Sequence, residues 1–257
     1  MTAPLARFAG LFVPYEKRLG LGLVHRPQYA YCMWHAGKLA QRLGHERISV
    51  LEFGVAGGNG LVAIEQHAAE IERRLSVKFE IYGFDAGSGL PAPEDYRDLP
   101  YHWRAGFFKM DETGLRARLK RSKLVLGPVK DTAASFLDQH KPPPVGCVFH
   151  DLDFYSSTRD ALQVFDGAPE FFLPRLFNYF DDTIGSETEL YNDFTGQRLA
   201  INEFNEKHAT KKVSRCYHLA RYIRRPVWHE QVFVLHDFAH PRYNAFVSDE
   251  NQQLPLE

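Results

Sequence analysis

Short apolar runs alternate with helix-like segments along most of this 257-residue chain. The runs are rich in β-branched and aromatic residues, and the segments between them contain glycines or apolar residues at helical spacing. Strand candidates of this kind cover 48–55, 79–85, 123–129, 145–151, 175–182 and 229–238. Because strands that alternate with helices build a parallel sheet covered on both faces, the pattern predicts an α/β fold.

Three segments fall outside this alternation. Residues 1–45 are expected to form an N-terminal arm and a helix, because apolar residues recur at helical spacing in their second half. The remainder, 46–257, is expected to be one domain. It contains two long insertions, 86–110 and 183–215, which follow predicted strands and which we interpret as lids over a binding site.

The charged residues are balanced, with 31 Lys and Arg against 32 Asp and Glu. Such a chain has no net positive field to attract nucleic acid or an anionic membrane, so neither is expected as a partner. The three cysteines form no CxxC pair, which argues against a zinc site or a disulfide framework. We expect a soluble cytoplasmic protein, in which the arm 1–45 offers a contact surface for a homo-oligomer.

The stretch LEFGVAGGNG, residues 51–60, lies between the first predicted strand and a predicted helix. Gly54, Gly57 and Gly58 permit a tight turn and a close backbone approach to a ligand, and the helix that follows offers unpaired N–H groups. An ordinary flexible turn would have the same composition. Glu52 sharpens the interpretation, because a carboxylate inside an apolar strand needs donors, and a ligand ammonium group is one such partner.

Asp85 ends the second predicted strand, where a carboxylate can accept hydrogen bonds from the two hydroxyls of a ribose. A dinucleotide fingerprint places its acid about 20 residues beyond the glycines, in a GxGxxG context. Asp85 lies 27 residues after Gly58, and the loop lacks the GxGxxG order. This spacing favours S-adenosylmethionine over a nicotinamide cofactor. A nicotinamide-dependent oxidoreductase and a non-catalytic cofactor-binding protein are the alternative interpretations.

Pairs of carboxylates end the fourth and fifth predicted strands. Asp151 and Asp153 follow one strand, and Asp181 and Asp182 follow the other. If the two strands are neighbours, their ends open on the same edge, and four carboxylates would repel one another unless a cation or protonation relieved them. Oxygen ligands suit Mg²⁺. The alternatives are a helix cap at Asp153 and an ordinary turn at Asp181 and Asp182.

A resemblance to a known family follows from several segments taken together. They are LEFGVAGGNG, YGFDAGSGLP (82–91), LGPVKDTAASF (126–136) and HDLDFYSSTRDAL (150–162) followed by FDD (180–182). The chain resembles class I S-adenosylmethionine-dependent methyltransferases and, more narrowly, the macrocin O-methyltransferase family, which methylates hydroxyls on sugars of natural products. The resemblance implies a Rossmann-like, doubly wound, mostly parallel seven-stranded sheet and a small-molecule hydroxyl acceptor.

The same resemblance implies roles for individual residues. Cofactor-binding roles fall on Glu52, Gly54, Gly57, Gly58, Asp85, Ser88, Asp131 and Thr132. The implied ligands of a divalent metal, Mg²⁺ in our interpretation, are Asp151, Asp181 and Asp182. Without the resemblance, Asp131 and Thr132 indicate only the start of a helix. The candidate bases for the acceptor hydroxyl are Asp151 and His150, and Asp151 is preferred because a histidine beside a strand end is more often structural.

Overall fold

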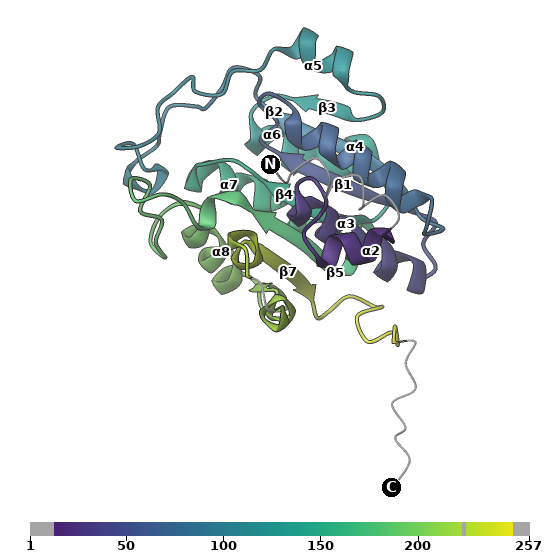
Figure 1. Cartoon of the computed structure of the whole chain (residues 1–257). Helices are drawn as coiled ribbons and strands as arrows, with labels where there is room; N and C mark the ends of the chain where they lie inside the picture. Colours follow the sequence, from purple (N-terminus) through teal and green to yellow (C-terminus); the bar gives the residue numbers. More distant parts are fainter. Residues whose placement is uncertain (1–12, 223–224, 249–257) are drawn as a thin grey trace, which may run out of the picture.

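The computed structural model describes residues 13–222 and 225–248 (Figure 1), so the predicted arm is described from residue 13 onward. The described strands are β1 Arg47–Phe53, β2 Lys78–Asp85, β3 Lys123–Leu126, β4 Val145–His150, β5 Phe172–Phe180, β6 Lys211–Arg215 and β7 Val232–Asp237. The described α-helices are α2 Tyr15–Gly20, α3 Pro27–Arg42, α4 Asn59–Glu72, α5 Glu112–Arg118, α6 Val129–His140, α7 Tyr155–Leu162 and α8 Gly196–Lys207. The predicted α/β alternation is confirmed.

The seven strands form one sheet in the order β3-β2-β1-β4-β5-β7-β6. Strands β3, β2, β1, β4 and β5 pair in parallel, whereas β7 runs antiparallel to both β5 and β6. The sheet is therefore mixed: most of its strands are parallel, as expected, but β7 pairs antiparallel to both of its neighbours. We did not predict β6, because its sequence KKVSR contains one apolar residue, Val213, and it forms the polar edge of the sheet.

The segment 183–215, predicted as one insertion, contains three kinds of structure. It includes helix α8 and the edge strand β6. The irregular part is 184–195. The other predicted insertion, 86–110, is irregular except for the short 3-10 helix η2, Tyr96–Asp98.

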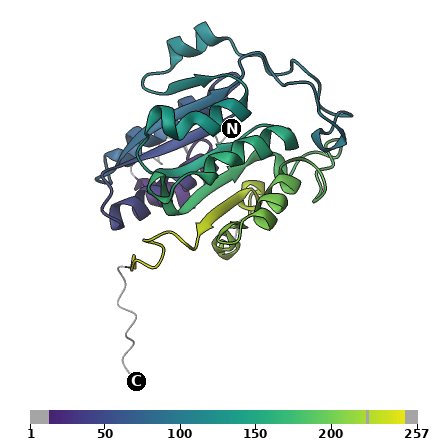
Figure 2. The same ribbon diagram turned by 180° about the vertical axis from the view of Figure 1, so that it is seen from behind.

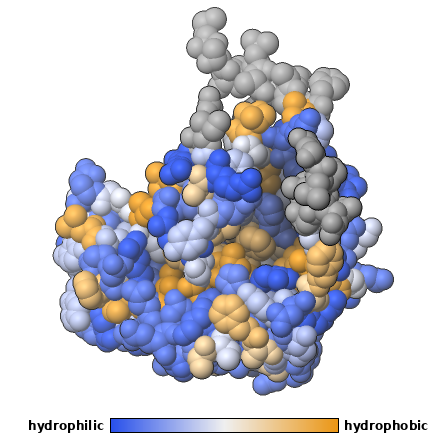
Figure 3. All heavy atoms as spheres, turned by 90° about the horizontal axis from the view of Figure 1, so that it is seen from below, coloured by the Kyte–Doolittle hydropathy of each residue, from blue (hydrophilic) through white to orange (hydrophobic). Residues whose placement is uncertain are grey.

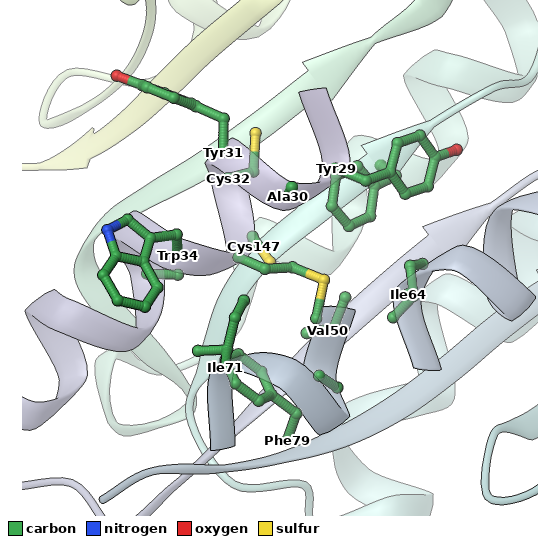
Figure 4. Packing of buried hydrophobic residues seen from close by; sticks show 14 of the residues in the cluster. Tyr29, Ala30, Tyr31, Cys32, Trp34, Val50, Ile64, Ile71, Phe79 and Cys147 are labelled. Atoms are coloured by element: carbon green, nitrogen blue, oxygen red, sulfur yellow. The ribbon is translucent and has the colours of Figure 1, made fainter. Parts of the chain in front are cut away.

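Helices cover both faces of the sheet, as Figures 1 and 2 show from opposite sides. Helices α2, α3 and α4 pack on one face, and α6, α7 and α8 pack on the other. Figure 4 shows the first of these two cores, where side chains of α3 and α4 meet those of β1 and β4. Ala30, Cys32, Val50, Ile64 and Cys147 are fully buried there.

The strand register brings the ends of four strands to the same level. Phe53 of β1 pairs with Phe84 of β2 and with His150 of β4. His150 in turn pairs with Phe180 of β5. The residues that follow these positions therefore leave the sheet side by side, with neighbouring strands about 4.8 Å apart. The predicted adjacency of β4 and β5, on which the predicted metal site depends, is confirmed.

The surface drawn in Figure 3 is mostly hydrophilic, and hydrophobic groups gather in a recess near its centre. Within the described parts of the chain, no helix combines the length and the hydropathy needed to cross a membrane.

Candidate functional site

The glycine loop after β1 is fixed by contacts that exclude larger residues. Gly54 has a φ of 86°, and a Cβ atom there would lie 1.6 Å from the carbonyl oxygen of Asp151. Gly58, with a φ of 75°, is the N-cap of α4, and the Leu115 side chain occupies the space where a Cβ would be. Gly57 has open space around it. The sequence predicted a close approach of the loop backbone to a ligand. At Gly54 the backbone instead closely approaches the carbonyl oxygen of Asp151, where β1 and β4 end.

Asp85 organises this loop through backbone hydrogen bonds. Its Oδ2 accepts from the N–H of Val55 at 2.9 Å and of Ala56 at 2.8 Å, and its Oδ1 accepts from the N–H of Gly87 at 2.6 Å. Ala56 adopts a positive φ of 43°, which this pair of bonds stabilises. Asp85 thus ends β2, as predicted, and its carboxylate joins the glycine loop to the start of the insertion 86–110.

Glu52 is almost completely buried beneath the loop, with 1% of its surface exposed. Its Oε1 accepts a 2.8 Å hydrogen bond from the Tyr29 hydroxyl and lies so close to Gly60 that a Cβ there would overlap it. Its Oε2 has no hydrogen-bond partner among the described residues. Burial raises the pKa of the Glu52 carboxyl to about 8, although the bond from Tyr29 opposes the rise. An unpartnered buried carboxylate oxygen fits a cationic ligand group.

The raised pKa of Glu52 predicts a pH-dependent stability. The folded-state pKa of about 8 exceeds the unfolded value near 4.3, so the protonated carboxyl stabilises the fold at low pH. That contribution is lost as the pH rises towards 8, with a limiting slope of about 1.4 kcal/mol per pH unit. We expect Glu52→Gln to make the free energy of unfolding less dependent on pH between 5 and 8. Urea denaturation of ligand-free parent and variant measures this, and parallel curves would contradict it.

Three carboxylates meet where β4 and β5 end. Asp151, Asp181 and Asp182 each offer one oxygen atom, and these atoms lie within 4.8 Å of one another. Burial raises the pKa of Asp151 and of Asp182 well above the usual range, and the neighbouring carboxylates raise both further. The Tyr179 hydroxyl donates to Asp181 Oδ1 at 2.5 Å and holds that side chain in place. These three residues, the carboxylate trio, are those that the family resemblance implied as metal ligands.

Asp153 lies beside this trio without belonging to it. Its backbone N–H donates to Asp182 Oδ2 at 2.9 Å, and its φ is 60°. Burial first, and then the charges of Asp181 and Glu189, raise the pKa of its carboxyl to about 7. The N-cap of α7 is Phe154, which makes no side-chain cap, so Asp153 does not cap the helix.

Asp98 supplies the carboxylate at the start of α7. This buried residue accepts 2.8 Å hydrogen bonds from the backbone N–H and from the hydroxyl of Ser156. It also accepts from the N–H of Glu94 at 2.8 Å, so it fastens the insertion 86–110 to the helix. Sequence reasoning missed Asp98, because no local pattern pairs a loop acid with a helix so far along the chain.

His150 is a core residue in this arrangement. Its ring stacks on Phe180 with centroids 4.2 Å apart, and its Nε2 lies 3.1 Å from the amide oxygen of Asn178. Burial lowers the pKa of the imidazole to about 4, so it is neutral at pH 7. His150 does not line the cavity beside the trio, whereas Asp151 does.

A cavity of about 560 Å³ opens between the glycine loop, the insertion 86–110 and the start of α7. Of the predicted site residues, it is lined by Gly54, Asp85, Ser88 and Asp151. Asp131 and Thr132 are not in its wall; Asp131 is exposed, and the Thr132 hydroxyl donates to backbone carbonyl groups of its own helix start. Their neighbours Pro128, Val129 and Lys130 line it instead.

Two irregular segments meet next to the carboxylate trio. The Tyr101 hydroxyl donates to the carbonyl oxygen of Glu189 at 2.6 Å, and the Tyr191 hydroxyl donates to Asp182 Oδ1 at 3.3 Å. These segments also carry exposed large apolar side chains, namely Tyr96, Tyr101, Phe107, Phe108, Leu190 and Phe194. Phe108 lines the cavity. Exposed aromatic groups beside a cavity are typical of a binding surface.

Comparison with known proteins addresses the fold. No protein-family model and no curated protein matches the chain. The structure is similar to that of the O-methyltransferase NovP, with a TM-score of 0.56 and 13% identity over 82% of this chain and 79% of that one. It is also similar to CalS11, a calicheamicin methyltransferase, with a TM-score of 0.54 and 17% identity over 91% of this chain and 90% of that one. The chain has a methyltransferase fold.

In this methyltransferase fold, the predicted residues gather at the edge where ligands bind open α/β sheets, beyond the carboxyl ends of the strands. The glycine loop follows β1, Asp85 ends β2, and the carboxylate trio follows β4 and β5. The glycine loop, Asp85 and the trio thus lie at one edge, whereas Asp131 and Thr132 lie outside the cavity wall, and the binding roles of all these residues stay predictions. Tyr29, Asp98 and Tyr179, which hold the predicted acids or the insertion in place, were not predicted.

Proposed function

We propose that this protein is an S-adenosylmethionine-dependent O-methyltransferase that acts on a hydroxyl of a small molecule with the help of Mg²⁺. The observation that carries the proposal is the position of the carboxylate trio at the same sheet edge as the glycine-loop cavity. A methyl donor held by the loop and an acceptor held by the trio would be in contact there.

The cavity fits the cofactor in size and chemistry. Its volume of about 560 Å³ lies in the range of small-molecule sites. S-adenosylmethionine carries a sulfonium and an ammonium group, and Asp85 and Asp151 supply carboxylates in the cavity wall. Glu52, whose Oε2 has no hydrogen-bond partner among the described residues, is buried beneath the loop, outside that wall. We assign the methionine part to Glu52 and the loop 54–58, the ribose to Asp85, and the loop that closes over the cofactor to Ser88. Asp131 and Thr132 stay assigned to the adenine end, where Pro128 to Lys130 form the wall.

The trio fits a divalent cation. Three carboxylates with oxygen atoms within 4.8 Å of one another form a hard, oxygen-only donor set, and hydration completes the coordination of Mg²⁺ in such sites. Burial and the mutual repulsion of the carboxylates raise the pKa values of Asp151 and Asp182, and a bound cation would relieve that repulsion. When bound, Mg²⁺ supplies Lewis acidity that lowers the pKa of an acceptor hydroxyl.

The protein's own residues would orient the acceptor and accept its proton. Asp151 is the better candidate base, since it lines the cavity while His150 is buried with Nε2 against Asn178. Tyr179 orients Asp181, and the hydrogen bond from Tyr101 to the carbonyl group of Glu189 joins the two insertions. Most of the rate would come from holding donor and acceptor in line.

The acceptor proposed is a hydroxyl on a sugar of a natural product or glycan. Exposed aromatic side chains of the two insertions offer flat apolar surfaces that pack on the faces of sugar rings. Transfer is tested by incubating the protein and labelled S-adenosylmethionine with a pool of hydroxyl-bearing metabolites and detecting labelled products by mass spectrometry. Transfer should stop with EDTA and return with Mg²⁺.

Two outcomes would favour the alternatives. Tight cofactor binding without transfer to any hydroxyl in the pool would indicate a non-catalytic binding protein. A larger rise in melting temperature with NADH than with S-adenosylhomocysteine would indicate an oxidoreductase.

Removing the Asp85 carboxylate is expected to weaken cofactor binding at least about tenfold. Asp85→Ala removes three backbone hydrogen bonds to a charged group, each worth about 1.5–3 kcal/mol, and thereby frees the glycine loop. Titration calorimetry with S-adenosylhomocysteine measures the change. Asp138→Ala, at an exposed carboxylate of α6, is the matched control and should bind like the parent. Unchanged affinity in Asp85→Ala would place the cofactor elsewhere.

A further inference from the structure

A second cavity, of about 410 Å³, lies on the face of the sheet that α3 covers. Its wall comes from α3, β5, β7 and the segment after β6, and it shares no residue with the glycine-loop cavity. Lys38, Arg42 and Arg175 line it together with three histidines, and none of the described residues in the wall is acidic. A cavity with this composition attracts anions.

Arg175, in the wall of this cavity, has one guanidinium nitrogen without a hydrogen-bond partner among the described residues. Its Nη1 donates to the carbonyl oxygen of Tyr243 at 3.2 Å, and its guanidinium lies 5.3 Å from the centre of the Tyr243 ring. Its Nη2 is buried and has no hydrogen-bond partner within the described chain. Buried guanidinium N–H groups are nearly always paired, so this one points to an acceptor that the protein does not supply.

His35 lies among cationic side chains in the cavity wall. Burial lowers the pKa of His35 to about 4, and the neighbouring His218, Lys38 and Arg42 lower it further. Glu16 opposes this effect from outside the cavity wall, where it pairs with Lys38 at 3.4 Å. A bound anion would compensate the remaining positive charge.

Aromatic rings form one wall of the cavity. The rings of Tyr31 and His35 have centroids 4.3 Å apart, and those of His35 and Phe177 are 5.7 Å apart. Both Tyr31 and Phe177 line the same cavity as the cations. The site therefore combines donors for a compact anion with ring faces on which a planar group could stack.

We propose that this cavity binds a phosphate group carried by a small molecule. Phosphate oxygens match the fork of an arginine and the point charge of a lysine, and a dianion balances the cluster better than a single carboxylate. The proposal is independent of methyl transfer, because the cavity lies apart from the glycine loop and the carboxylate trio. The phosphate could be free inorganic phosphate or the head of a ring-bearing phosphomonoester.

Two probes separate these sources. Inorganic phosphate and phenyl phosphate are titrated into the full-length protein, and the imidazole NMR signals of His35 and His218 are followed. Saturable shifts with both probes are expected, and tighter binding of phenyl phosphate would assign a role to the ring wall. Equal affinities would assign the site to the phosphate alone. Sodium chloride at matched ionic strength should produce no saturable shift, and if it reproduces the shifts the proposal fails.

Variants locate the binding. Arg175→Gln and Lys38→Gln should each weaken phosphate binding at least about tenfold, which corresponds to one lost charge-assisted contact. Lys38 is partly exposed, so Lys38→Gln keeps the proposal testable if Arg175→Gln fails to fold. Arg73→Gln, at an exposed arginine of the α4 C-cap, is the control and should bind like the parent. Parent-like affinity in both cavity variants would overturn the proposal, whatever the outcome for S-adenosylhomocysteine binding.

Discussion

Asp151→Asn is expected to lower methyl transfer by about 10²–10⁴-fold, the range for loss of a positioned general base. Asparagine keeps the shape of the side chain but removes both the proton acceptor and one of the three carboxylates of the trio. Mg²⁺ should also bind more weakly, because the remaining donor set carries one charge less. Initial rates at saturating cofactor and a Mg²⁺ titration measure the two effects separately.

The same substitution should stabilise the metal-free protein. The pKa of Asp151 is raised in the folded state, so the parent loses stability as the pH rises from the unfolded pKa of about 3.9 towards the raised folded pKa, and every unit of the shift is worth about 1.4 kcal/mol. The gain in Asp151→Asn should therefore increase as the pH rises from 5 to 8 and should shrink when Mg²⁺ is added. If Asp151→Asn were less stable than the parent at pH 8, the carboxylates of the trio would not be destabilising the metal-free fold. Asp138→Asn should change neither property.

The anionic character of this sheet edge extends from the glycine loop to the trio. Tyr29 donates to Glu52, Tyr179 donates to Asp181, and the two rings lie 5.9 Å apart. The charge of Glu52 also raises the pKa of Asp151, and both carboxylates raise the pKa of the Tyr29 hydroxyl. Buried carboxylates in such number are stable only as acids or with cations beside them. The proposed sulfonium cofactor and the proposed divalent metal would supply positive charge of two kinds at this edge.

The sequence predicted the elements of this site that depend on local pattern. Apolar runs that end in an acid placed Asp85, Asp151 and Asp181 at strand ends, and the adjacency of β4 and β5 then brought the carboxylates of Asp151 and Asp181 together. The glycines marked a close approach, although the sequence alone could not show that the carbonyl of Asp151 makes it at Gly54.

The sequence could not predict the supporting contacts, because they join residues that are remote along the chain. In the sequence, Tyr29 is indistinguishable from the other apolar residues of its helix. Its hydrogen bond to Glu52 depends on how α3 packs across β1. Asp98 reads as a loop acid until α7 is placed beside it. Edge strand β6 escaped prediction for a related reason, since its pairing with β7 comes from backbone bonds and leaves little hydrophobic signal.

Gly54→Ala is expected to destabilise the fold by about 2–5 kcal/mol. A residue with a side chain loses about 1–2 kcal/mol at a left-handed φ, and overpacking costs about 1–3 kcal/mol more. Both terms apply, because Gly54 has a φ of 86° and a Cβ there would lie 1.6 Å from the carbonyl oxygen of Asp151. Relief of the overlap would push β1 away from β4, so the trio and the cofactor loop should both be displaced and Mg²⁺ binding should weaken.

Gly57→Ala, three residues along the same loop, is the matched control. No atom lies within 4 Å of a Cβ at Gly57, and its φ is not positive, so alanine should be neutral or should stabilise the fold by about 0.4–1 kcal/mol. Urea denaturation of the ligand-free proteins compares the two variants under identical conditions. If both lose the same free energy of unfolding, the loop is governed by a general need for flexibility. A loss confined to Gly54→Ala shows that the contact between the ends of β1 and β4 sets the geometry of the site.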